Sequence, residues 1–181
     1  MKIGTIMAYG QTGAGKTFTI NGSATNFKYR GIIPRCISMI FQEIQSRYDK
    51  SFIVRISYLE IYNEIMTDLL ALSLEPEKDQ ALSIMEDEKG SVHVKGLLER
   101  VCPTEEDALS MLFEGETNRT LTEHKMNKNS SRSHCIFTIS LEMRSKVESS
   151  EKVITAKLNL VDLAGSERTK KTGKKTALLS S

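Results

Sequence analysis

The apolar residues of this chain follow two periods, one of two residues and one near 3.6, and the first predicts its strands. A short apolar run over residues 3–9 ends at Gly10, which predicts a buried strand that enters a glycine-rich turn. Apolar and polar residues alternate over 52–61 and 134–143, and a further strand is predicted over 153–161.

Helical spacing occurs between these strands. A helix is predicted to begin at Lys16, a polar loop covers 21–31, and an amphipathic helix is predicted over 32–48. Residues 104–107 resemble a capping box, with Asp in place of the usual Glu, and open a third helix. The apolar residues that this helix is expected to bury are Leu109, Leu112 and Phe113. Strands and helices interleave, which is typical of an α/β fold with a layered sheet.

The remaining segments are predicted to connect these strands and helices. Residues 63–70 are expected to form a short helical turn, and the polar stretches 73–80 and 145–151 are expected to be surface loops. Short alternating runs on both sides of residues 89–90 predict a hairpin over 82–97.

Composition limits the classes of function. With 181 residues, 39% hydrophobic and 27% charged, the chain has the size and composition of one globular domain. A net charge of only +2 does not indicate a nucleic-acid partner, and no apolar stretch is long enough for a membrane span or a signal peptide. None of the three cysteines lies in a C-x-x-C pair, which disfavours a disulfide framework or a zinc site and favours a reducing compartment. We therefore expect a cytosolic protein without a membrane partner.

Residues 10–17 match the phosphate-binding pattern G-x-x-x-x-G-K-[ST] at every specified position. Glycines in such a loop let successive backbone N–H groups point inward and bind an anion. Lys16 then places a cation on the β- and γ-phosphates, and the Thr17 hydroxyl is a suitable oxygen ligand for Mg²⁺. The residues expected to bind the nucleotide phosphates are Gly10, Gln11, Thr12, Gly13, Ala14, Gly15, Lys16 and Thr17. An apolar strand precedes the motif, so a chance glycine-rich turn is the weaker alternative.

The strand predicted over 153–161 leads directly into Asp162, and Gly165 follows three residues later. In P-loop NTPases an Asp at a strand end holds Mg²⁺, directly or through water. A glycine can offer its N–H to the γ-phosphate because no side chain blocks the approach. Taken alone, a strand that ends in an exposed carboxylate explains the pattern equally well. Beside a complete phosphate loop, the metal-binding interpretation is favoured.

A dense polar run over 127–134 precedes another predicted strand. Ser130 and Ser131 are candidates to bind Mg²⁺ or to position a water, and Arg132 is a candidate to stabilise charge or to pair with a carboxylate. Composition alone favours a capping loop rich in Ser and Asn over these roles. His134 is expected to be a partly buried, hydrogen-bonded histidine and not a ligand.

Three blocks together resemble a kinesin motor domain, in the order and spacing of that family. They are A-Y-G-Q-T-G-A-G-K-T at 8–17, N-x-x-S-S-R-S-H at 127–134 and D-L-A-G-S-E at 162–167. Residues 57–64 are also similar to a kinesin segment, and 126–139 resembles the cilium-associated kinesin-nine group most. The resemblance extends to about Gly173. It implies a P-loop NTPase fold, with helices flanking a central mixed sheet, ATP and Mg²⁺ as cofactors, and the microtubule as partner.

The resemblance also implies roles for single residues. Ser130 and Ser131 would belong to the first switch loop and contact Mg²⁺, the γ-phosphate and the attacking water. Arg132 and Glu167 would form an ion pair that closes when ATP is bound. The Gly165 N–H would sense the γ-phosphate.

The family implies two further nucleotide contacts and a microtubule surface. Asp162 would hold Mg²⁺ through water, and Phe18 matches a position where the family places a His or an aromatic ring near the adenine. The alternative for Phe18 is a core aromatic residue that opens a helix. The hairpin at 84–97 resembles a tubulin-facing loop. A basic cluster that could meet acidic tubulin, or else form a solvated tail, contains Arg168, Lys170, Lys171, Lys174 and Lys175.

Relative to that family, the chain is expected to be incomplete at both ends. It begins at the strand before the phosphate loop, and residues 174–181 diverge soon after the second switch begins. Residues 1–181 are therefore interpreted as a partial motor domain that lacks the dimerisation region. The first strand is expected at an unpaired sheet edge. Weak nucleotide affinity and doubtful hydrolysis are expected for the isolated chain.

The leading hypothesis is ATP hydrolysis coupled to microtubule binding and movement, in the cytoplasm on the cytoskeleton and, for the kinesin-nine group, in a cilium or flagellum. A GTPase is disfavoured because residues 127–130 have Ser where the guanine-reading Asn-Lys-x-Asp segment has Asp. A truncated, non-enzymatic protein that binds tubulin or another motor chain is the third alternative. The intact Lys16, Thr17, Asp162 and Gly165 argue against it.

Overall fold

The computed structural model describes residues 1–23, 26–71, 82–88, 90–126, 130–146 and 153–167. Predictions for 73–80, most of 145–151, the basic cluster at 168–175 and the stretch 174–181 fall outside these residues. None of the described helices is long and apolar enough to cross a membrane.

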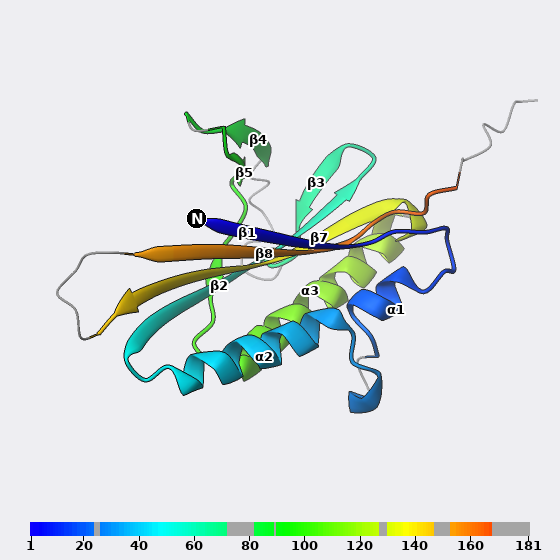
Figure 1. Ribbon diagram of the computed structural model, residues 1–181. Helices are drawn as coiled ribbons and strands as arrows, with labels where there is room; N and C mark the ends of the chain where they lie inside the picture. The colour runs from blue at the N-terminus through cyan, green and yellow to red at the C-terminus, as the bar shows by residue number, and fades with distance from the viewer. Residues whose placement is uncertain (24–25, 72–81, 89, 127–129, 147–152, 168–181) are drawn as a thin grey trace, which may run out of the picture.

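The fold is organised around one mixed sheet (Figure 1). Its main path runs β1-β8-β7-β2-β3, and β6 also pairs with β2. β1 and β8 are parallel, whereas the other pairs are antiparallel. The strand bounds are Lys2–Ala8 (β1), Lys50–Tyr62 (β2), Ile65–Asp68 (β3), Arg100–Val101 (β6), Ser133–Ser145 (β7) and Ile154–Asp162 (β8). A separate hairpin joins β4 (Ser83–Glu86) to β5 (Val92–Lys95), as predicted for this part of the chain.

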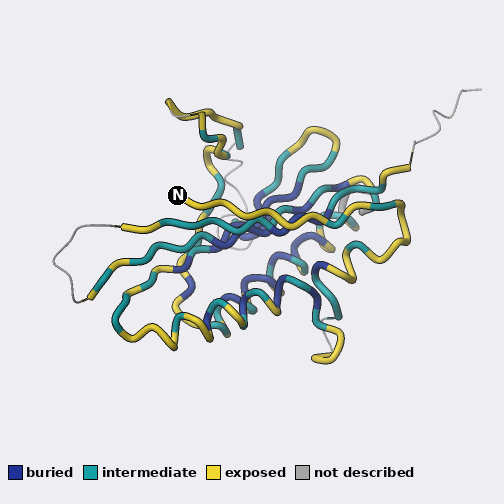
Figure 2. Tube along the Cα trace, viewed as in Figure 1, coloured by how far each residue is buried: buried dark blue, intermediate teal, exposed yellow. Residues whose placement is uncertain are grey.

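The α-helices of the described residues lie together on one side of this sheet (Figure 1). They are α1 (Lys16–Ile20), α2 (Ile32–Ser46) and α3 (Glu105–Met126); short 3₁₀ helices occur at η1 (Phe27–Tyr29) and η2 (Ser130–Arg132). Buried residues concentrate between the helices and the sheet, whereas β1 and the β4–β5 hairpin are largely exposed (Figure 2). The core is therefore one apolar layer beneath the sheet.

Helix α3 begins as the capping box predicts. The Asp107 N–H donates to Thr104 Oγ1 at 3.1 Å, and the Thr104 N–H donates to Asp107 Oδ2 at 3.2 Å. This reciprocal pair satisfies backbone donors that the first turn of a helix leaves without partners. Farther along, Gly115 lets α3 approach β2 closely, because a Cβ there would lie 2.3 Å from the Tyr58 ring. The close approach sets the register of the helix on the sheet.

One predicted side-chain placement in α3 is wrong. Phe113 is 65% exposed, whereas Leu112 is buried and Leu109 partly buried. The face that meets the sheet is formed by Ala108 and Met111 together with Leu112. Phe113 lies about 100° further round the helix and points outward.

The helical turn predicted over 63–70 is also wrong, since this segment forms the second strand of a hairpin. Asn63 and Glu64 have φ of 50° and 64°, and Tyr62 pairs directly with Ile65. Two consecutive residues in the left-handed region form the tight turn whose twist matches antiparallel strands. Asn tolerates this conformation, but Asn-Glu is a weaker turn signal than Asn-Gly.

Strand β1 was predicted to be buried, and the structure shows it exposed. Ile3 and Met7 are 59% and 61% exposed. Within the described residues β1 pairs only with β8, so its other edge is open, as the sequence predicted. An apolar run predicts a strand without specifying how many neighbours it has.

Candidate functional site

The loop between β1 and α1 curls tightly. Gly13 and Gly15 have φ of 80° and 85°, a region that side-chain-bearing residues rarely adopt. The Ala14 N–H donates to the Gln11 carbonyl at 3.2 Å, which closes a turn within the loop. The glycines are thus required by the backbone path of the loop as well as by its fit to an anion.

A cavity of about 290 Å³ opens beside this loop. It brings together three segments that are far apart in the sequence: the loop and α1, η2, and the stretch after β8. The residues that line it are Thr12, Gly13, Gly15, Lys16, Thr17, Phe18, Ser131, Asp162, Leu163 and Gly165. The register of β1 on β8 explains this convergence, because Ala8 lies opposite Asp162 and both strands end at the same edge.

Thr17 and Asp162 meet at the base of the cavity. Thr17 Oγ1 donates to Asp162 Oδ2 at 2.6 Å. Asp162 is 4% exposed, and its Oδ1 is buried with no hydrogen-bond partner among the described residues. A hydroxyl and a carboxylate oxygen suit Mg²⁺, which favours oxygen ligands and keeps several of its waters. The donor set therefore fits a magnesium ion that is completed by waters and by phosphate oxygens.

The donors expected to bind phosphates have partners within the chain. Lys16 Nζ donates to the Gln11 carbonyl at 2.9 Å. The Gly165 N–H donates to the Ser131 carbonyl at 2.7 Å, which joins the two predicted switch segments. Ser131 also lines the cavity; for Ser130, which lies in η2, the side chain is outside the described residues.

Glu167 lies across the mouth of the phosphate loop. Its carboxylate accepts hydrogen bonds from the Thr12 N–H at 2.9 Å and from the Thr12 hydroxyl. These bonds hold the pKa of the Glu167 carboxyl below its usual value. Among the described ion pairs Glu167 has none with Arg132, which is exposed. The structure thus shows a different partner for Glu167 from the one predicted for the ATP-bound form.

The surroundings of His134 and Phe18 test the predictions made for these two side chains. His134 Nδ1 accepts a hydrogen bond from the Ala164 N–H at 3.1 Å, as expected for a partly buried, satisfied histidine. Phe18 is 57% exposed and lines the cavity, so the alternative of a core aromatic residue is wrong.

Comparison with known proteins agrees with this geometry. The family model of the kinesin motor domain matches residues 2–180. The chain belongs to the kinesin family. Its solved relatives include a fast kinesin, with a TM-score of 0.86 and 38% identity over 96% of this chain and 48% of that one. The predicted P-loop NTPase fold of a kinesin motor domain is therefore confirmed.

Two individual kinesins have a higher sequence identity to this chain than the solved structure has. It is 54% identical to kinesin-like protein KIF9 of Mus musculus over 97% of its length, and 52% identical to kinesin-like protein KLP1 of Chlamydomonas reinhardtii over 94%. These relatives agree with the kinesin-nine assignment. The chain spans 22% of the length of each of these two relatives. As a kinesin motor domain it has a nucleotide-binding fold, and the GTPase alternative is set aside.

Sequence reasoning missed the buried polar cluster behind the site of this kinesin motor domain. Arg119 of α3 is 6% exposed. Its guanidinium lies 3.7 Å from Asp162, 3.9 Å from Glu60 and 3.3 Å from Glu123. Arg119 thus places a positive charge on the core side of the Asp162 carboxylate, which offsets part of the cost of burying that carboxylate.

One signal in the sequence could have revealed this cluster. Arg119 continues the spacing of Ala108, Met111, Leu112 and Gly115, so it falls on the face of α3 that meets the sheet. A charged residue at a core position needs a buried partner of opposite charge. The spacing therefore predicts a buried ion pair but not the identity of its partners.

Proposed function

We propose that residues 1–181 form the catalytic middle of an ATP-driven microtubule motor, a partial motor domain in which ATP binding and hydrolysis are coupled to microtubule binding and movement. The observation that supports this most is the convergence of the phosphate loop, Ser131 and Asp162 on one cavity. The fold brings these segments together, and the side chains that bind phosphate and magnesium, those of Lys16, Thr17 and Asp162, are all present where they meet.

The residues of the site would have two kinds of role: some would hold the phosphates and Mg²⁺, and others would form the switches. Amides of residues 10–17 and Lys16 would hold the nucleotide phosphates, and Thr17 with Asp162 would hold Mg²⁺. When bound, Mg²⁺ would supply positive charge to the phosphate oxygens. Ser131 would reach the metal or the γ-phosphate, and Ser130 would help to orient the attacking water.

The second switch would respond to the γ-phosphate. In this structure the Gly165 N–H points to the Ser131 carbonyl, and Glu167 occupies the Thr12 donors. A γ-phosphate would compete for both sets of donors. Release of Glu167 from Thr12 would free it to pair with Arg132, and the exchange of partners would convert phosphate binding into movement.

Microtubules would be the partner, and the cytoskeleton, including that of a cilium or flagellum, the location. The named relatives are kinesins, and the β4–β5 hairpin extends from the main sheet with Ile84 and Val92 64% and 67% exposed. Such apolar residues on an extended hairpin fit a protein-binding surface. The alternative, a non-enzymatic tubulin- or motor-binding protein, would use the same hairpin without turnover.

Nucleotide binding and microtubule co-sedimentation test this proposal together. We expect residues 1–181 by themselves to bind Mg-ATP weakly. A longer motor domain that contains them should release phosphate at a rate that microtubules increase, and should co-sediment more strongly with a non-hydrolysable ATP analogue than with ADP. Co-sedimentation that is equal with the ATP analogue and with ADP, together with no phosphate release, would support the non-enzymatic alternative. Absence of Mg-ATP binding would reject the catalytic proposal.

The contact between Glu167 and Thr12 predicts that the Glu167 carboxylate competes with the nucleotide phosphates for the Thr12 donors. Replacing Glu167 with Gln should raise the affinity for Mg-ADP about two- to fivefold, because a neutral acceptor competes less well than a carboxylate for the Thr12 donors. ADP is the right probe because the Arg132 pair is expected only with ATP. Titration of a fluorescent ADP measures the effect, with Glu64→Gln as the exposed control. An unchanged or weaker affinity for ADP would contradict the prediction.

A further inference from the structure

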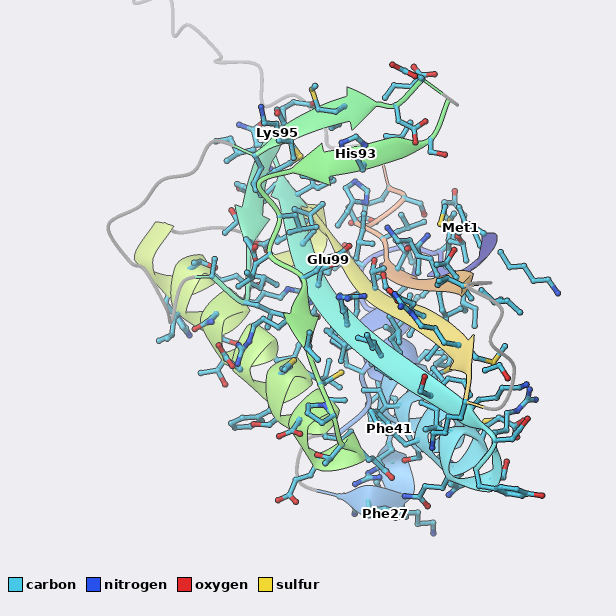
Figure 3. The ribbon with its side chains drawn as sticks, turned by 90° about the vertical axis from the view of Figure 1, so that its left-hand side faces the viewer. Met1, Phe27, Phe41, His93, Lys95 and Glu99 are labelled. Atoms are coloured by element: carbon cyan, nitrogen blue, oxygen red, sulfur yellow. The ribbon has the colours of Figure 1, made fainter. Side chains whose placement is uncertain are left out.

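A short connection, residues 96–99, leads from the β4–β5 hairpin to β6 and the main sheet. β4 and β5 pair with each other and with no other strand among the described residues. Figure 3 shows β5, which carries His93 and Lys95, continuing past Glu99 toward β6 beside β2. Strand pairing within the described residues therefore does not set the position of the hairpin relative to the main sheet.

The connection is constrained directly after the end of β5. Gly96 has φ of 89°, a value that residues with side chains rarely adopt. The Leu97 N–H donates to the Val94 carbonyl at 3.4 Å, and the Leu98 N–H donates to Asp68 Oδ2 at 2.7 Å. The chain thus turns as it leaves the hairpin and is then bonded to the last residue of β3.

Asp68 holds both segments that flank the hairpin in the sequence. It is buried, with 8% of its surface exposed. Its Oδ1 accepts hydrogen bonds from the Leu70 and Ala71 N–H groups at 2.9 and 3.2 Å, and its Oδ2 accepts the bond from Leu98. Hydrogen bonds to a carboxylate are stronger than those to a neutral acceptor. One side chain therefore ties the segment that enters the hairpin region to the segment that leaves it.

Helix α3 binds the same two segments. Asn118 Nδ2 donates to the Leu69 carbonyl at 2.7 Å, and Glu114 pairs with Arg100 at 2.7 Å. Glu114 and Asn118 are four residues apart, so they lie on one face of the helix. The next residue, Arg119, is the one that lies behind the candidate site. α3 is thus a single rigid element that contacts both the base of the hairpin and the candidate site.

We propose that Asp68 is a positioning residue for protein binding, which together with Asn118 holds the β4–β5 hairpin in one orientation on α3. The inference rests on the proposed function, in which the hairpin contacts the microtubule. A surface that is held in its binding orientation loses less conformational entropy when the partner binds. If Asp68 only ended β3, its loss would lower the stability of the chain without changing the orientation of the hairpin.

The distance between two spin labels tests the orientation directly in the 181-residue chain. One label is attached at Val92→Cys on the hairpin and the other at Thr117→Cys on the outer face of α3, both exposed positions. Cys36→Ser removes the partly exposed native thiol, and Cys102 and Cys135 are buried. Double electron–electron resonance then gives the distribution of distances between hairpin and helix. We expect a single narrow distribution for the parent chain.

Two variants should broaden this distribution about twofold. Asp68→Asn keeps the shape of the side chain, but its NH₂ group cannot accept a hydrogen bond, so the link between the two segments is lost. Asn118→Leu removes the donor to the Leu69 carbonyl and leaves Asp68 in place. Asp49→Asn is the matched control, because Asp49 is paired with Lys50 far along β2 from the hairpin, and it should leave the distribution unchanged. Circular dichroism verifies that each variant folds.

Microtubule binding tests whether the orientation matters to the partner. In co-sedimentation with microtubules, Asp68→Asn should weaken binding of the chain about fivefold. Its affinity for fluorescent Mg-ADP should stay unchanged, because Asp68 does not line the cavity. A general loss of structure would lower both affinities, so the difference between them separates positioning from stability.

The outcomes separate this inference from the proposed function. An unchanged label distribution in both variants overturns the positioning role, whatever the parent chain binds. A broadened distribution with undiminished microtubule binding overturns the role in partner binding. If the parent chain does not sediment with microtubules, the proposed partner fails, whereas the label distances still decide whether Asp68 and Asn118 orient the hairpin.

Discussion

Replacing Arg119 with Met lowers the free energy of unfolding of this chain by about 3–5 kcal/mol. Arg119 is buried among the carboxylates of Glu60, Glu123 and Asp162, of which Glu60 is 0% exposed. Methionine fills much of the same volume but has no charge, so it leaves buried carboxylates without their cation. Urea unfolding followed by circular dichroism measures the loss, and a smaller nucleotide affinity should accompany it because Asp162 loses a neighbour.

Two further variants separate the charge effect from a packing effect. Arg144→Met is the matched control, because Arg144 pairs with Glu142 on an exposed strand end, where an ion pair contributes about 0–1 kcal/mol. Glu60→Gln in the Arg119→Met background should recover part of the stability, since it removes one of the stranded charges. A loss below 1 kcal/mol in Arg119→Met, or no recovery in the double variant, would show that the cluster is not an energetically coupled unit.

Replacing Lys16 with Ala lowers the affinity for Mg-ATP by about 10- to 100-fold, because it removes the charge-assisted contact to the phosphates. Lys16 Nζ is bonded to a neutral carbonyl, that of Gln11, at 2.9 Å, and has no salt bridge with any described carboxylate. Its charge is therefore available to a phosphate at little cost. Isothermal titration with Mg-ATP measures the change.

The controls for Lys16 follow from its place at the start of α1, where it is partly buried. Lys50→Ala removes an equally charged residue, one that pairs with Asp49 at the start of β2, and should leave the nucleotide affinity unchanged. The stability of Lys16→Ala without nucleotide should stay within about 0.5 kcal/mol of the parent chain. An Mg-ATP affinity that survives the Lys16 substitution would mean that the phosphates bind elsewhere.

The local patterns of the sequence were sufficient for most elements. The alternation at β7, the helical spacing of α2 and the capping box of α3 each depend on residues close together in the chain, and each element formed where it was predicted. The exceptions have a common origin. Asn63 and Glu64 form a tight turn because the antiparallel pairing of β3 with β2 stabilises it. Phe113 is exposed because the packing of Gly115 against Tyr58 sets the rotation of α3. The first outcome depends on the pairing of two neighbouring strands and the second on a contact between distant segments, so packing and not the local pattern decides both.

For the candidate site too, some features could be predicted from the sequence and others depend on the tertiary structure. The phosphate loop and the strand ending at Asp162 could be recognised from the sequence, because the residue types that bind phosphate and magnesium stand at motif spacing. Their meeting is decided by the parallel register of β1 on β8. Likewise, only the packing of α3 on the sheet brings Arg119 to Asp162, and only the fixed path of the segment after α1 brings Tyr29 to Phe18. The sequence shows which chemical groups are present. Whether two charged groups or two aromatic rings are in contact depends on the distance between them, which only the fold sets.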